Sequence, residues 1–234
     1  MSVKQILFNT EMVRAILDGR KSCTRRIVKP QQLVGLLPDK CKNGVPEEFL
    51  KEKKFMFKPY CNMTDSELIM TSYKKPYQPG DILYVRETWE HFECCCCEGD
   101  EHGNCYREPQ QSVLNKSCGC YMYRATDEIY GDAKWHPSIH MPKEAARIWL
   151  KVTDVRVERL QEITTNQIEQ EGVETEYPHV LNGEEKKYAF QNLWNSTIKK
   201  SDLDFYGWDA NPWVWVIEFE VCDKPEREGQ YDGE

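Results

Sequence analysis

The stretch that decides the fold is Trp213-Val214-Trp215-Val216-Ile217-Glu218-Phe219-Glu220-Val221, near the end of the chain. Its apolar and acidic side chains alternate, which is typical of a strand with one buried face because successive side chains point to opposite sides of a strand. We expect the apolar members to face inward and the two acids outward: Trp215, Ile217, Phe219 and Val221 against Glu218 and Glu220.

Further short strands are predicted upstream of this one. The apolar run Ile82–Val85 follows the turn signal Pro79-Gly80-Asp81, and Ile148–Val157 reads as a long strand. Together with Val3–Phe8 and the closing strand, these segments should belong to one curved sheet or small barrel. Because short strands alternate with helices, the sequence favours an α+β fold with a mixed sheet over a parallel α/β fold.

Helices are predicted between the strands from their caps and apolar spacing. Asn9 or Thr10 should cap a first helix that ends at Gly19, and Thr164 or Thr165 a second that ends at Gly172. A third helix is expected over Tyr188–Ile198, and a short one over Lys143–Arg147 after Pro142. In the first helix one face is apolar, through Met12, Val13, Ile16 and Leu17.

The composition predicts a folded protein without a membrane helix. The chain has 234 residues, of which 40% are hydrophobic and 12% aromatic, and no run approaches the roughly 18 apolar residues that cross a bilayer. The N-terminus lacks a signal-peptide pattern, so we expect a cytoplasmic protein. The prediction is one domain over residues 1–222, with insertions at about 31–76 and 93–120 and a mobile acidic tail at 223–234.

The net charge of −8 excludes a protein that coats nucleic acid through bulk charge. A local basic site remains, because residues 20–29 contain five bases and no acid. We expect a loop there that leads into a strand at Ile27-Val28. This loop is either a solvated charged face or a cradle for an anion or nucleotide.

Two residues of this basic loop suggest chemistry. Lys21 and Thr24 stand three apart, and a threonine hydroxyl attacks a carbonyl only when a base removes its proton. Lysine can be that base if neighbouring positive charge lowers its pKa, and Arg20, Arg25 and Arg26 are the candidates. Cys23 is a rival nucleophile that the spacing neither favours nor excludes.

The segment Gly19-Arg20-Lys21-Ser22-Cys23-Thr24-Arg25-Arg26 resembles the opening motif of ASCH domains, which belong to the PUA-like β-barrel superfamily. Supporting segments are Pro79-Gly80-Asp81, Leu160-Gln161-Glu162-Ile163-Thr164 and the closing strand. Residues 135–147 and 211–215 look like the larger form found in phages and prophages. The resemblance covers roughly residues 1–30, 77–92 and 121–222, and it implies a mixed β-barrel with flanking helices.

The resemblance also implies recognition of RNA or a modified nucleoside in a cleft beside the barrel. Similar small bacterial proteins hydrolyse the amide of N4-acetylcytidine with a lysine, a threonine and a glutamate, which fall here on Lys21, Thr24 and Glu171. Substrate binding is then expected from Arg20, Arg25, Arg26 and Trp89. Two alternatives stay open: Lys21 and Glu171 form only a structural salt bridge, or the protein is a non-catalytic module that binds RNA or a host protein. Ribonuclease activity is a third option that no histidine pair supports.

A cysteine-rich segment predicts a structural zinc ion. Cys94, Cys97, Cys118 and Cys120 form two close pairs separated by a loop, as in zinc ribbons, although the second pair is C-x-C. Cys95, Cys96, His102 and Cys105 are further possible ligands. With eleven cysteines and no export signal, the alternative is a set of free thiols in a reducing compartment.

Trp89 follows the strand Ile82–Val85 closely. Its ring could stack on a nucleobase, since bases are held on aromatic faces without sequence preference. The alternative, which is the commoner fate of a tryptophan, is a place in the core.

Overall fold

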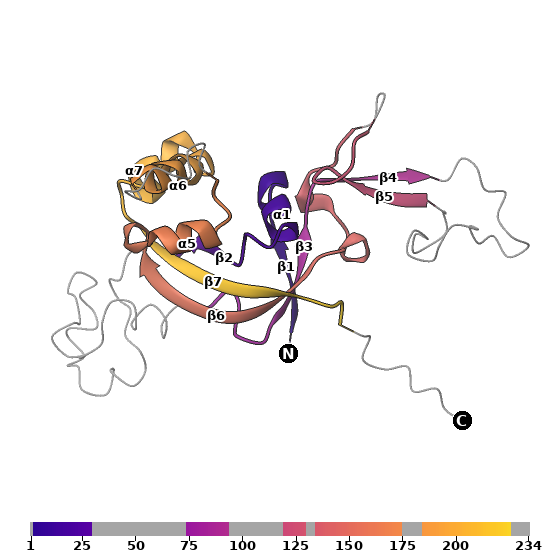
Figure 1. Cartoon of the computed structure of the whole chain (residues 1–234), viewed down its shortest axis with the longest axis horizontal. Coiled ribbons are helices and arrows are strands. Elements are labelled where there is room, and N and C mark those ends of the chain that lie inside the picture. The colour runs from indigo at the N-terminus through magenta and orange to yellow at the C-terminus, as the bar shows by residue number, and fades with distance from the viewer. Residues whose placement is uncertain (1, 30–73, 94–118, 130–133, 175–183, 226–234) are drawn as a thin grey trace, which may run out of the picture. The chain divides into compact units, whose positions relative to one another are not determined.

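The computed structural model describes residues 2–29, 74–93, 119–129, 134–174 and 184–225 (Figure 1). Most of the predicted insertion at 31–76, the cysteine-rich segment up to residue 118 and most of the predicted tail lie outside the described residues. By their contacts, the residues form two compact units. Unit 1 comprises Met1–Arg20, Gly80–Lys151 and Glu220–Glu234, and unit 2 comprises Lys21–Pro79 and Val152–Phe219. That the units make one domain stays a prediction.

Five strands form a mixed sheet, and two form a separate antiparallel pair. The order in the larger sheet is β1 (Val3–Leu7), β3 (Ile82–Arg86), β6 (Trp149–Arg159), β7 (Trp213–Cys222) and β2 (Cys23–Ile27). Figure 1 shows β6 and β7 side by side as long, curved strands. The four predicted strand segments all lie in this sheet, so the mixed α+β class is confirmed. Among the described strands β1 does not pair with β2, so the predicted barrel is not closed.

Unit 1 is built on the parallel pair of β1 and β3, to which the start of β6 adds antiparallel. Helix α1 (Thr10–Leu17) begins as predicted, with the side chain of Asn9 accepting a hydrogen bond from the Met12 amide. Gly19 follows with φ of 72°, a conformation that glycine adopts without strain. Of the predicted apolar face, Val13 and Ile16 are buried, whereas Leu17 is 46% exposed.

The core of unit 1 includes a cluster formed by Ile82, Met141, Ala145, Ala146 and Trp149. Met141 lies between two 3-10 turns, η3 (Ser138–His140) and η4 (Lys143–Ala145). The helix predicted over Lys143–Arg147 is therefore a single 3-10 turn after Pro142. The separate pair, β4 (Trp89–Glu93) and β5 (Gly119–Tyr123), was not predicted as a hairpin.

Unit 2 packs helices on the antiparallel pair of β2 and β7. The helices and 3-10 turns of unit 2 are η5 (Leu160–Glu162), α5 (Thr165–Gln170), α6 (Glu184–Ser196), η6 (Lys200–Asp202) and α7 (Leu203–Tyr206). Thr164 caps α5 as predicted, and its side chain and that of Gln167 bond each other's backbone amides. One core cluster joins Leu160, Ile163, Ile168, Phe190, Trp194, Val214 and Val216.

Two predictions about the strands need correction. The basic loop is mostly strand, because Cys23–Ile27 pairs along β7 as β2. Strand β7 is buried on both faces from Trp213 to Ile217, since Val214 and Val216 pack under α5 and α6 while the intervening residues are also covered. At the other end of β7, Val221 is 62% exposed rather than buried.

Candidate functional site

Lys21 and Glu171, both in unit 2, are in direct contact. The Lys21 ammonium donates hydrogen bonds to Glu171 Oε2 at 2.7 Å and to the Glu171 main-chain oxygen at 2.8 Å. Their side chains are 0% and 5% exposed. The backbones are also tied here, because Ser22 N donates to Gln170 O. This contact fits both the catalytic interpretation and the structural salt bridge.

Arg25, on strand β2, also binds the Glu171 carboxylate. Its Nη1 donates to Glu171 Oε1 at 3.1 Å, and its Nη2 lies 3.4 Å from Glu158 Oε2. The Arg25 side chain is 1% exposed. Each oxygen of the Glu171 carboxylate therefore accepts from a different cation, which is the arrangement that makes a buried charge tolerable.

The ion network continues outward from Arg25 towards solvent. Glu158 Oε1 accepts from Arg156 Nε at 2.6 Å. Arg156 Nη1 also donates to Asp154 at 2.8 Å and to Glu218 at 2.5 Å. Burial alone would lower the pKa of Arg156, but hydrogen bonds to its three carboxylates outweigh burial and raise it. An unbroken chain of ion pairs thus runs from buried Lys21 to half-exposed Arg156.

Thr24 lies on the other face of β2. In the register, Arg25 is opposite Val216, and Thr24 is opposite Ile217. Residues directly opposite each other in an antiparallel pair share a face, and successive residues alternate. Arg25 therefore lies on the face that carries Glu171 and α5, whereas Thr24 projects from the opposite one. The structure brings Lys21 and Glu171 together but places the third predicted catalytic residue across the strand.

The rival nucleophile Cys23 is poorly suited to attack. Its side chain is buried, with Sγ 3.8 Å from Gln167 O and 3.9 Å from Arg25 Nη1. Burial, aided by the negative charge of Glu171, raises the pKa of Cys23 to about 12. Since the thiolate is the nucleophilic form of cysteine, the thiol stays inert at neutral pH.

The three arginines predicted to bind substrate have three different environments. Arg25 is occupied by two carboxylates. Arg26 shares the face of Thr24, opposite Trp215, and burial lowers its pKa although Glu171 opposes the shift. Arg20 belongs to unit 1, where it pairs with Asp18 at 2.8 Å. The sequence pattern of adjacent bases thus conceals alternation between the faces of a strand.

Trp89 opens β4 in unit 1 and packs against the core cluster there. Its ring centroid lies 5.7 Å from that of Tyr121 and 5.3 Å from that of His136. Its indole Nε1 is buried and has no hydrogen-bond partner among the described residues. This environment fits the core alternative, and base stacking by Trp89 stays a prediction.

The predicted zinc ligands Cys94, Cys97 and Cys118, with His102 and Cys105, lie outside the described residues. Cys120 lies in β5 opposite Phe92. The last pair of the hairpin joins Glu93 to Gly119, so the two strands meet where the cysteine-rich segment leaves and returns. That pairing fits ligands drawn from both sides of the segment. Within the described ranges no group of three or more His, Cys, Asp or Glu could hold a metal ion.

Sequence inspection missed a buried ion pair in unit 1. The Glu87 carboxylate, 1% exposed, accepts from Arg147 Nε at 2.9 Å and from Nη2 at 3.0 Å. The Arg147 guanidinium also lies 4.0 Å from the ring centroid of Tyr123. Burial raises the pKa of Glu87, and Arg147 only partly opposes that shift. The sequence signal for this pair was its position: Glu87 follows the predicted strand Ile82–Val85, and Arg147 precedes the predicted strand Ile148–Val157.

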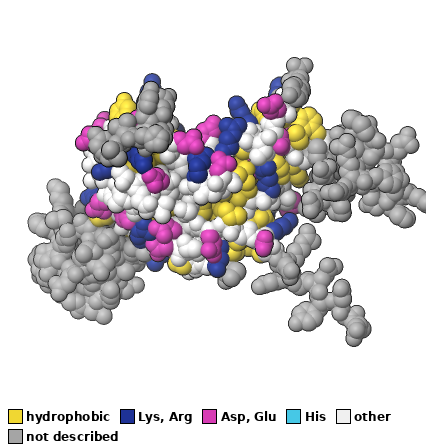
Figure 2. Space-filling model, viewed as in Figure 1, with side chains coloured by type: hydrophobic (Ala, Val, Ile, Leu, Met, Phe, Trp, Pro, Cys, Tyr) yellow, Lys and Arg dark blue, Asp and Glu magenta, His cyan; other side chains and the backbone are white. Residues whose placement is uncertain are grey.

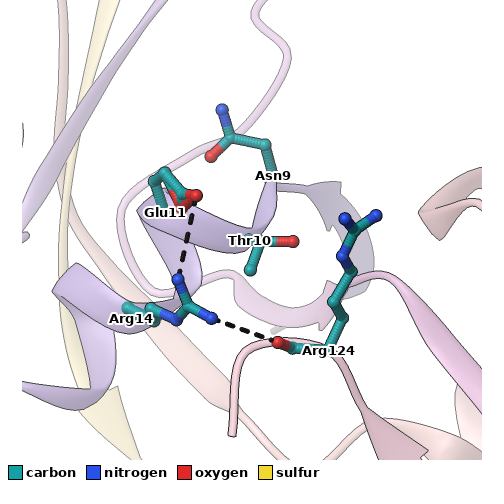
Figure 3. Close-up of a pocket in the computed structure, with 5 residues that line it drawn as sticks. All are labelled: Asn9, Thr10, Glu11, Arg14 and Arg124. Carbon is teal, nitrogen blue, oxygen red and sulfur yellow. Dashed lines mark hydrogen bonds and ion pairs between the residues drawn. The ribbon is translucent and has the colours of Figure 1, made fainter. Parts of the chain in front are cut away.

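A cavity of about 360 Å³ also opens in unit 1, lined by Asn9, Thr10, Glu11, Arg14 and Arg124 (Figure 3). Arg14 donates to the Arg124 main-chain oxygen at 3.4 Å and lies 3.8 Å from the Glu11 carboxylate. None of the residues predicted to be functional lines this cavity.

Neither the surface charge nor comparison with known proteins identifies a ligand for this site. Figure 2 shows acidic and basic side chains intermixed over the face it views. In the part of the chain that the structure describes, each helix is too short or too polar to cross a membrane. In comparisons with known proteins, no family model, characterised protein or solved structure matches the chain.

Proposed function

We propose that the chain is an ASCH-type protein of the PUA-like superfamily that recognises RNA or a modified nucleoside and hydrolyses an acyl amide on cytosine. The observation that carries this proposal is the 2.7 Å contact between Lys21 and Glu171. Lys21 comes from the motif that resembles ASCH domains, and Glu171 from the helix that the resemblance pairs with it. Their contact supports the assignment of both segments to one site.

The proposed hydrolysis begins with proton transfer between Lys21 and Glu171. Glu171 accepts a proton from Lys21, and the neutral amine then takes the proton of the Thr24 hydroxyl as its oxygen attacks the acyl carbonyl. The bond from the acyl carbon to cytosine N4 breaks, the leaving nitrogen takes the proton back from Lys21, and water hydrolyses the resulting ester. Thr24 projects from the other face of β2 and is buried, so this step requires its hydroxyl to come within hydrogen-bond reach of the Lys21 amine.

The second candidate is a non-catalytic module that binds RNA or a protein. The placement of Thr24 across the strand from Arg25 favours it, as does the burial of Lys21. In that case the ion network only fastens β2 to α5. Cytoplasmic location and phage or bacterial origin remain predictions under either proposal.

The two candidates differ in turnover. Purified protein is incubated with N4-acetylcytidine and the release of cytidine is measured by chromatography. The hydrolase proposal predicts release that Thr24→Ala abolishes and Thr24→Ser partly retains, because serine keeps a hydroxyl. Glu169→Gln on the exposed side of α5 is the matched control and should not change the rate. Absence of release by wild-type protein that still binds RNA favours the non-catalytic module.

A further inference from the structure

Arg25 is buried among carboxylates inside the protein, although its position in a basic motif predicted contact with nucleic acid. Its Nη1 binds Glu171, its Nη2 lies by Glu158, and its side chain is 1% exposed. A planar guanidinium presents its donors in a fixed fork, so one arginine can hold two carboxylates at a set separation. Both terminal nitrogens of Arg25 thus have protein partners, and its Nε is buried without a hydrogen-bond partner among the described residues.

The orientation of the Glu171 carboxylate depends on this fork. Lys21 reaches Oε2 while Arg25 reaches Oε1, so the carboxylate is held from both sides. An ammonium group is a freely rotating point charge and would not by itself fix the plane of the carboxylate. Arg25 supplies the second contact that does.

Glu158 fixes Arg25 in turn. It stands on β6, and its other oxygen is bound by Arg156, which Asp154 and Glu218 hold. The anchor of the buried group therefore lies on strands of the sheet rather than on a loop. Rigid elements of this kind hold functional groups more precisely than loops do.

From these contacts we infer that Arg25, anchored by Glu158, is a positioning residue that fixes the Glu171 carboxylate against Lys21 and does not touch the substrate. The inference rests on the proposed function where it concerns turnover. Where it concerns the Lys21–Glu171 contact, it can be tested without any turnover.

Two variants separate positioning from binding. Arg25→Lys keeps the charge but loses the fork, and Glu158→Gln leaves Arg25 intact while weakening its anchor. Glu158 is 20% exposed, so the second variant should fold even if the first does not. Glu169→Gln is again the matched control, because its carboxylate pairs with Lys186 at the surface.

If wild-type protein hydrolyses N4-acetylcytidine, each variant should lower kcat by about tenfold or more and change KM less than about twofold, since a misplaced catalytic group affects the reaction rather than binding. The control should match wild type. A raised KM with unchanged kcat in Arg25→Lys would overturn the inference, because Arg25 would then contact the substrate.

If wild-type protein shows no turnover, the proposed hydrolysis fails. The positioning role of Arg25 is then tested on the hydrogen bond between Lys21 and Glu171. Nitrogen-15 NMR of the lysine side chains should give a hydrogen-bonded Lys21 ammonium signal that is protected from exchange in wild type. Glu158→Gln should shift that signal or speed its exchange, and Glu169→Gln should leave it unchanged. An identical Lys21 signal in Glu158→Gln overturns the inference.

Discussion

Lys21 and Glu171 lie 150 residues apart in the sequence and are joined by a 2.7 Å hydrogen bond between almost completely buried side chains. A charge removed from water is costly unless an opposite charge and hydrogen bonds replace the solvent. Here the replacement is complete for Glu171, because both carboxylate oxygens and its main-chain oxygen accept from cations. The contact thus ties the start of β2 to the end of α5 whatever chemistry the site performs.

Glu171→Gln should lower the free energy of unfolding by about 3 kcal/mol, because removal of one partner leaves Lys21 and Arg25 buried with too little negative charge. The measurement is equilibrium unfolding in urea followed by tryptophan fluorescence. Glu169→Gln, two residues before Glu171 on the exposed side of α5, should change the same free energy by less than about 0.5 kcal/mol. Equal effects of the two substitutions would show that the buried contact does not form in solution.

The Cys23 thiol should not react with a thiol reagent at pH 8 in the native protein. With a pKa of about 12, only about one molecule in ten thousand carries the thiolate at that pH. The test compares wild type with Cys23→Ser. Both should show the same number of reactive thiols when native, and the variant should show one fewer after denaturation. A loss of one native reactive thiol in Cys23→Ser contradicts the prediction.

Glu87 should make stability fall as pH rises. Burial raises its pKa above the usual 4.5, so the folded state binds the proton more tightly than the unfolded state does. The stabilising contribution of protonated Glu87 is present below pH 4.5 and is lost as pH rises through the folded pKa. In urea unfolding between pH 4 and 7, the stability of wild type relative to Glu87→Gln should therefore decline with pH. A relative stability that increases with pH would mean that the ion pair with Arg147 outweighs burial.

Much of the strand pattern could be predicted from the sequence, because a buried strand needs a run or alternation of apolar residues. Ile82–Val85 and Trp213–Val221 carry that signal and both lie in the larger sheet. The exposure of Val221 could not be predicted, since local alternation does not reveal where the covering helices end. The basic segment was predicted as a loop because its charged side chains lack the apolar pattern of a buried strand. It forms strand β2 instead, in which alternation places Thr24 and Arg25 on opposite faces.

The pairing of Lys21 with Glu171 was predicted from the resemblance to ASCH domains and not from spacing, because no local pattern relates residues so far apart. Arg25, Glu158 and Arg156 were not predicted to form a network with them. An ion network that joins two strands and a helix exists only once the sheet register is set. Glu87 and Arg147 were missed for the same reason.

The purified protein should contain about one zinc ion, held by thiolates from both 94–97 and 118–120. The spacing of the cysteines predicts this, and the pairing of Glu93 with Gly119 brings together the strand ends that flank the segment. Elemental analysis of protein prepared under reducing conditions is the measurement.

Cys118→Ser should lower the zinc content and make residues 94–118 more sensitive to protease, while Cys222→Ser, at the end of β7, should do neither. Because the five-stranded sheet has its own core, removal of zinc with a chelator should leave its unfolding transition in place. Metal-free protein in which all seven thiols of residues 94–120 react in the native state would eliminate the zinc site.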